Sequence, residues 1–149
     1  MPAYPDLAIP LRTAIVNSTA VMDNMPAYSS GDAVFTRRPV PLDAPFPMIV
    51  IGPSISGQDE GGLNDQRLSI MRDVAIYGKN DTPASYRLCE TVSFSVRDLF
   101  HRNPNVIVVS GWKVVQIWAR GPIETPVDQP DQNVARTVEL SISLSAVMI

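Results

Sequence analysis

The sequence predicts an α+β fold, with a mainly antiparallel sheet of about five to six strands and two helices packed on one face. Three observations favour this class. Two segments carry apolar residues at helical spacing, several apolar runs are bounded by proline or glycine, and the C-terminal segment alternates between apolar and polar residues. When helices lie on one side of an antiparallel sheet, the apolar residues of the helices and those of the strands are buried against each other.

The two helices differ in how clearly their ends are marked. The first is predicted over about residues 6–20, followed by a polar loop over residues 17–33, so its end overlaps the loop. The second begins at Pro83, because Thr82 can cap a helix and proline fits the first helical position. Asn103 and the proline after it end this helix.

The predicted strands share apolar or alternating content between turn-forming residues. They cover residues 33–37, 46–51, 67–77, 106–109, 112–119 and 136–148. Arg72 interrupts an apolar face, which predicts a bulge near Met71 or an edge position for that strand. Residues 52–66 and 120–135 are rich in glycine, proline and polar residues, and we predict both as long loops.

Length and composition limit the possible classes. The chain has 149 residues, so we expect one domain over residues 1–149. A net charge of −3 argues against binding that depends on neutralising nucleic-acid phosphates. Charged residues make up 18%, and a weakly charged surface is cheap to desolvate at a protein interface. The sequence has no signal peptide and no membrane span, which predicts a soluble protein made in the cytosol.

We find no convergent set of catalytic groups, and we expect no catalytic, cofactor-binding or metal-binding residues. The single histidine, His101, follows Asp98 by one helical turn and is interpreted as structural. Cys89 lies on the apolar stripe of the same helix, roughly 18 Å from His101 at 1.5 Å per residue. A site that combines the two is therefore excluded, and the default for Cys89 is an inert buried thiol.

Two other groups of residues are interpreted as structural or interface residues, without a catalytic or metal-binding role. Asp59, Glu60 and Asp65 lie among glycines but lack the ligand alternation of a calcium loop. Trp112 and Trp118 are six residues apart on a predicted strand, so we expect them to share a face, in the core or at an interface.

Several segments together resemble one known family. They are the N-terminal helix from Asp6, the run Pro45-Phe-Pro-Met-Ile-Val-Ile-Gly, the strand from Leu68 to Tyr77, the long helix from Pro83 and the alternating C-terminal strand. This order resembles the tail-completion or tail-terminator family of long-tailed bacteriophages and gene transfer particles over nearly the whole chain. The proline-rich segment 120–135 departs from the family pattern.

The resemblance implies a structural virion protein, located at the tail–neck junction and made in the host cytoplasm. Such a protein forms a homo-oligomeric ring, usually of six subunits, that caps the tail tube and joins it to the head-closure or connector protein. DNA passes through the ring without being specifically bound, and no membrane is involved. We expect Asp59, Glu60 and Asp65 to face the lumen or the tube.

Other functions stay open at this point. A head-closure or neck ring protein of the same particle would have a similar size. From a different class, a small α+β enzyme with a site between subunits, or a ligand-binding domain, would reveal itself through paired carboxylates in a pocket or through saturable ligand binding.

Overall fold

The computed structural model describes residues 5–28, 31–36, 40–41, 43–59, 67–79, 83–125 and 133–147. Their regular elements are, in chain order, α1 (Ala8–Val16), α2 (Thr19–Met22), β1 (Val34–Phe35), β2 (Met48–Asp59), β3 (Arg67–Lys79), α3 (Pro83–Phe100), the 3₁₀ turn η1 (Pro104–Val106), β4 (Trp112–Thr125) and β5 (Asn133–Ala146).

The strands form one five-stranded sheet in the order β1-β2-β3-β5-β4. The short strand β1 pairs with β2 in parallel, and the remaining neighbours are antiparallel. The central β3–β5 pairing runs without interruption from Arg67 opposite Ser145 to Lys79 opposite Asn133. The expected mainly antiparallel sheet is therefore confirmed, with one parallel pair at its edge.

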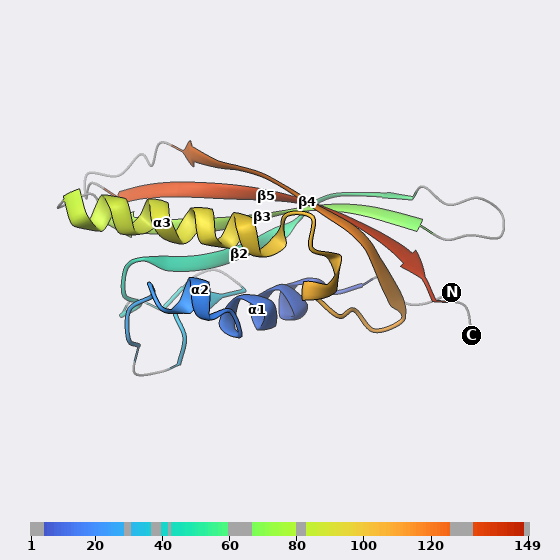
Figure 1. Cartoon of the computed structure of the whole chain (residues 1–149), viewed down its shortest axis with the longest axis horizontal. Helices are drawn as coiled ribbons and strands as arrows, with labels where there is room; N and C mark the ends of the chain where they lie inside the picture. The colour runs from blue at the N-terminus through green and yellow to red at the C-terminus, as the bar shows by residue number, and fades with distance from the viewer. Residues whose placement is uncertain are drawn as a thin grey trace.

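Helices α1 and α3 cover the same face of the sheet, as predicted, and α3 lies in front of the strands in Figure 1. The alternation in β5 explains this arrangement, because every second residue from Val138 to Leu144 is buried. These side chains pack with Val92 and Val96 of α3 and with apolar residues of α1 in one core cluster. A smaller cluster around Met48 and Val50 lies at the β1–β2 end.

The N-terminal helix is shorter than predicted, and the predicted loop contains a second helix. Instead of one helix over residues 6–20, α1 ends at Val16, and α2 begins within the stretch predicted as a loop. Ser18 causes this break, since its backbone is extended and its hydroxyl oxygen accepts a hydrogen bond from the backbone N–H of Val21 at 3.4 Å. A serine in that role ends one helix and caps the next.

Both predicted long loops are largely strand, because their Gly-Pro dipeptides form bulges. Gly52 and Pro53 lie between the pairs Ile51–Val74 and Ser54–Arg72, so two residues oppose one. Gly121 and Pro122 do the same in β4, between Arg120–Glu139 and Ile123–Thr137. Proline is tolerated at such bulges because its nitrogen is not needed for the ladder there. Strand β2 therefore continues to Asp59 and β4 to Thr125; residues 60–66 and 126–132 lie outside the described residues.

Gly121 is needed at its bulge for steric reasons. Its φ is +105°, a conformation that favours glycine, and a Cβ atom there would lie 2.8 Å from the carbonyl oxygen of Thr137. The bulge therefore depends on the missing side chain.

Two further strand predictions are wrong in detail. The segment 106–109 forms no strand; it consists of the end of η1 and an isolated bridge between Val109 and Trp112. Strand β3 is central rather than at an edge, and the irregularity predicted near Met71 belongs to β2, which shifts register opposite Met71 and Arg72.

The second helix is confirmed from Pro83 to Phe100, whereas its proposed cap Thr82 lies outside the described residues.

Arg72 supports the first bulge from the covered side of the sheet. Its side chain is 8% exposed, and its Nε and Nη2 atoms donate to the carbonyl oxygen of Gly52 at 3.0 and 2.7 Å. The bulge takes this carbonyl out of the regular ladder, and a charged donor compensates for the loss. An arginine that appears to interrupt an apolar face therefore holds the bend of β2.

Replacing Arg72 by methionine should lower the free energy of unfolding by about 1.5–3 kcal/mol, because the Gly52 carbonyl loses a charge-assisted partner in a partly buried position. Arg87→Met is the matched control, since Arg87 is exposed on α3 and should change stability by less than about 0.5 kcal/mol. Chemical denaturation of both variants measures the difference. Equal stabilities would show that the bond to Gly52 contributes nothing.

Candidate interaction surfaces

The structure describes only part of the predicted acidic site. Asp59 is the last residue of β2, where its backbone pairs with Leu68. Glu60 and Asp65 lie outside the described residues. Figure 1 shows the ends of β2 and β3 extending past the helices at one end of the molecule. The role of the three residues stays a prediction.

His101 and Cys89 have structural contacts. The backbone N–H of Ala119 donates to Nδ1 of His101 at 3.1 Å, and the imidazole ring meets the indole of Trp118 edge-on at 4.6 Å. Asp98 contacts Arg97 at 3.3 Å. The thiol of Cys89 is buried and donates to the carbonyl of Ile76 at 3.6 Å. Burial raises the pKa of Cys89 to about 11, so little nucleophilic thiolate forms near neutral pH.

The described residues offer little for metal chemistry. They contain no group of three or more His, Cys, Asp or Glu side chains placed to hold a metal ion. Among the same residues, no helix is both long and apolar enough to cross a membrane.

One face of the sheet carries no described helix, and we call it the helix-free face. Its residues are identified by register, because cross-strand partners point to the same side. They are Ser69, Met71 and Asp73 of β3, Thr137, Glu139, Ser141 and Ser143 of β5, and Gln116, Trp118, Arg120 and Ile123 of β4. Most of these side chains are small or uncharged, so the face is suited to contact with another protein.

Trp118 is the largest apolar group on this face. It is 49% exposed, and Ile123 farther along β4 is 40% exposed. Trp112, by contrast, is 5% exposed and lies in the core, so the expectation that the two tryptophans share a face is wrong. The cause is a register shift between Val114 and Gln116, where one extra residue moves the following side chains to the other face. Trp118 therefore points away from the core.

Asp73 is electrostatically unfavourable on the helix-free face. Its Oδ1 atom is buried and has no hydrogen-bond partner among the described residues, and Glu139 is its direct cross-strand partner. Burial, followed by repulsion from Glu139, raises the pKa of Asp73. Like charges directly opposite each other destabilise a sheet, so this pair lowers the stability of the folded chain.

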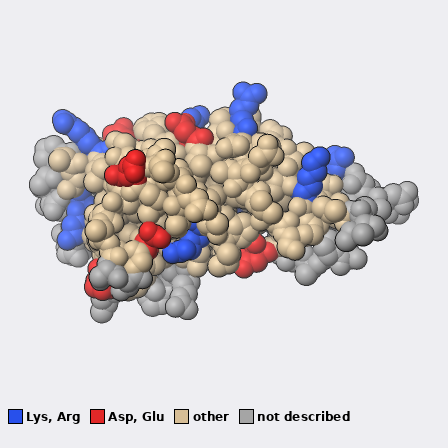
Figure 2. Space-filling view, turned by 60° about the horizontal axis from the view of Figure 1, so that its bottom comes forward, with Lys and Arg blue, Asp and Glu red and all other residues tan. Residues whose placement is uncertain are grey.

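A groove of about 610 Å³ lies on the other side of the molecule, and we call it the helix-side groove. It is lined by α1, the start of α2, Leu99 of α3 and residues 106–108. None of the described residues lining it is charged, and Ile9 and Val108 are 59% and 85% exposed. Figure 2 turns the lower side of Figure 1, where α1 and α2 lie, toward the viewer, and its charged residues are scattered over a largely uncharged surface.

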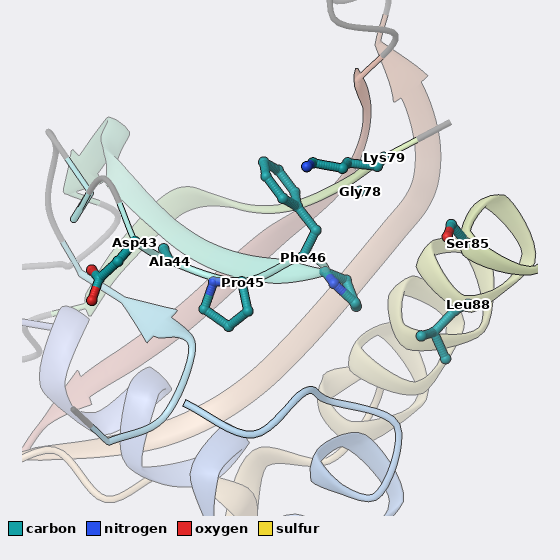
Figure 3. Close-up of a pocket in the computed structure, with 9 residues that line it drawn as sticks. Asp43, Ala44, Pro45, Phe46, Gly78, Lys79, Ser85 and Leu88 are labelled. Carbon is teal, nitrogen blue, oxygen red and sulfur yellow. The ribbon is translucent and has the colours of Figure 1, made fainter. Parts of the chain in front are cut away.

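A second cleft of about 420 Å³ is formed by residues 43–47, the end of β3 and the start of α3. Its charged side chains are Asp43 and Lys79, which lie at different ends of the cleft in Figure 3. Lys79 extends over the ring of Phe46, with Nζ 5.3 Å from its centroid. Asp43 accepts a hydrogen bond from the hydroxyl of Tyr28 at 3.0 Å. This cleft thus does not bring paired titratable groups together.

Sequence reasoning missed the helix-side groove, and it did not separate the outward Trp118 from the buried Trp112. The groove joins two segments about ninety residues apart in the chain. The sequence carried no local signal for the groove, because the exposure of Val108, which lies in a segment predicted as a strand, becomes apparent only in the folded chain.

The fold and these surfaces define the class: a small α+β protein with a one-sided helix layer and two weakly charged surfaces suited to protein contacts. A solved structure of the same fold is a chain of the virion of a native gene transfer agent (GTA) particle. It aligns with a TM-score of 0.67 at 16% identity, covering 94% of this chain and 93% of that one. No protein-family model matches the chain, and the comparison with curated proteins finds no match.

Asp73→Asn should raise the free energy of unfolding at about pH 7 by about 0.5–1 kcal/mol, since it removes one of two opposed charges. A carboxyl whose pKa is raised on folding destabilises the protein when ionised, so the gain should shrink as the pH falls toward about 4. Asp98→Asn is the control, because its side chain is 72% exposed. Denaturation at several pH values tests this, and a gain that does not change with pH would contradict it.

Proposed function

We propose that this protein is a structural component of a phage-like virion, and specifically a tail terminator. In this role, copies form a ring, most simply of six subunits, that caps the tail tube at the tail–neck junction and joins it to the head-closure or connector protein. The protein is made in the host cytoplasm, has no enzymatic step, and lets DNA pass through the ring without specific binding.

One observation carries the proposal: the chain shares its fold, over nearly its whole length, with a chain of a gene transfer agent virion. Two others support it. The described residues present weakly charged surfaces for protein contact, and their histidine and cysteine are occupied by structural contacts. A weakly acidic chain also suits a ring through which DNA slides, since it lacks an excess of positive charge to hold phosphates.

The proposal predicts that the purified protein halts the growth of tail tubes. Mixed with the tail-tube protein encoded beside it, it should produce tubes with a ring at one end and a length distribution shorter than in its absence. Negative-stain imaging and sedimentation measure both effects. Bovine serum albumin at equal concentration is the control, and tubes that grow unchanged and uncapped would contradict the terminator role.

We further propose that Asp59, Glu60 and Asp65 face the lumen or the tube. Changing all three to Asn, Gln and Asn removes three negative charges, and we expect at least a severalfold loss of DNA-filled, infectious or transducing particles, because phosphate repulsion in the channel is weakened. Three matched changes at Asp23, Asp98 and Glu90 are the control. Normal particle yield from the first variant would refute this placement.

A further inference from the structure

We propose that the ring interface is heterologous, with Trp118 and Ile123 of one copy inserted into the helix-side groove of the next copy. The inference rests on the proposed function, because only an assembling protein needs such an interface. It adds to that function the two surfaces that meet and the chemistry that joins them.

The first argument is that the two surfaces cannot meet within one chain. Trp118 pairs with Ser141 on the helix-free face, whereas the groove is formed by α1 and α2 on the helix-covered side. Since the sheet lies between them, an apolar contact between them requires a second molecule. Two different patches facing opposite directions define a head-to-tail contact, which closes into a ring when the rotation between copies allows it.

The second argument is the match in polarity. The groove has no charged lining residue, so a charged partner would lose its hydration there without gaining a counter-ion. Trp118 and Ile123 bring apolar surface and one indole N–H, which the hydroxyls of Thr13, Ser18 or Thr19 in the lining can accept. A partly exposed tryptophan is also a typical interface anchor.

The third argument is that the anchor is held rigid before binding. The edge-on contact between Trp118 and His101 fixes the indole, and His101 itself is held by the N–H of Ala119. In addition, the backbone N–H of Arg102 donates to the carbonyl of Ile117 at 2.8 Å, which braces the same part of β4. A side chain ordered in advance loses less entropy on binding.

The test uses three variants of the full chain. Trp118→Ala removes the anchor, Ile9→Glu with Val108→Glu puts charges on the exposed rim of the groove, and Phe94→Ala is the control because Phe94 is 46% exposed but outside both surfaces. Self-association is measured by sedimentation over a concentration series. We expect the first two variants to associate at least about thirtyfold more weakly than the unchanged chain, and the Phe94 variant to associate normally.

Mixing the two defective variants separates a head-to-tail contact from a symmetric one. The groove variant still has Trp118 and the anchor variant still has an intact groove, so the mixture should form dimers with one working contact and nothing larger. If each surface instead met the same surface of another copy, each variant alone would still dimerise through its intact surface, and mixing the two would produce no new dimer.

A cross-linking variant covers the case in which the substitutions impair folding. The double variant Val108→Cys with Ile123→Cys should give a ladder of covalent oligomers with a short thiol cross-linker, whereas either single variant should give none. Cys89 does not interfere because it is fully buried. A missing ladder, or association unaffected by both defective variants, would overturn the interface. If tubes are still capped in that case, the terminator role stands and the copies meet elsewhere.

Discussion

The uninterrupted pairing of β3 with β5 is the constraint on which the rest of the molecule depends. Each residue of β3 has a partner in β5, so the two strands fix which side chains face the helices. Apart from Arg72, their even-numbered residues from Ile70 to Ile76 and from Val138 to Leu144 form the floor of the core. A slip of one residue would expose this whole set, which makes the register strongly preferred.

The long helix is attached to this central pair by apolar and polar contacts together. Its buried stripe includes Cys89, Val92 and Val96. Near its start, Tyr86 accepts a hydrogen bond from Nη2 of Arg136 at 3.0 Å and contacts Glu124 at 3.2 Å, linking α3 to β5 and β4. The other end is fixed through residues 101 and 102 against β4. The helix layer and the edge strand that carries Trp118 therefore form one rigid arrangement.

The sequence was sufficient where a local pattern coincided with the final packing. The alternation in β5 and the proline start and apolar stripe of α3 predicted both elements well. The sequence was insufficient where one extra residue in a strand reversed which side chains face the core. The bulge at Val115 places Trp112 and Trp118 on different faces in this way. The glycine-proline pairs were predicted to end strands, but in the structure they bend them. The sequence alone does not distinguish the two outcomes, because they depend on pairing with the neighbouring strand. The groove could not be predicted, since it joins distant segments.

The two glycine-proline bulges have a consequence for the chain in concentrated solution. Both lie in strands at or next to the ends of the sheet. Strand β4 is an outer strand, and among the described residues the strand that pairs with the outer side of β2 is the two-residue β1. Exposed strand edges invite indiscriminate pairing with other chains and hence aggregation. A proline bends the edge and offers no N–H to an incoming strand, so Pro53 and Pro122 interrupt any continuous template there. The free chain at high concentration is thereby protected from fibrous self-association through its strand edges.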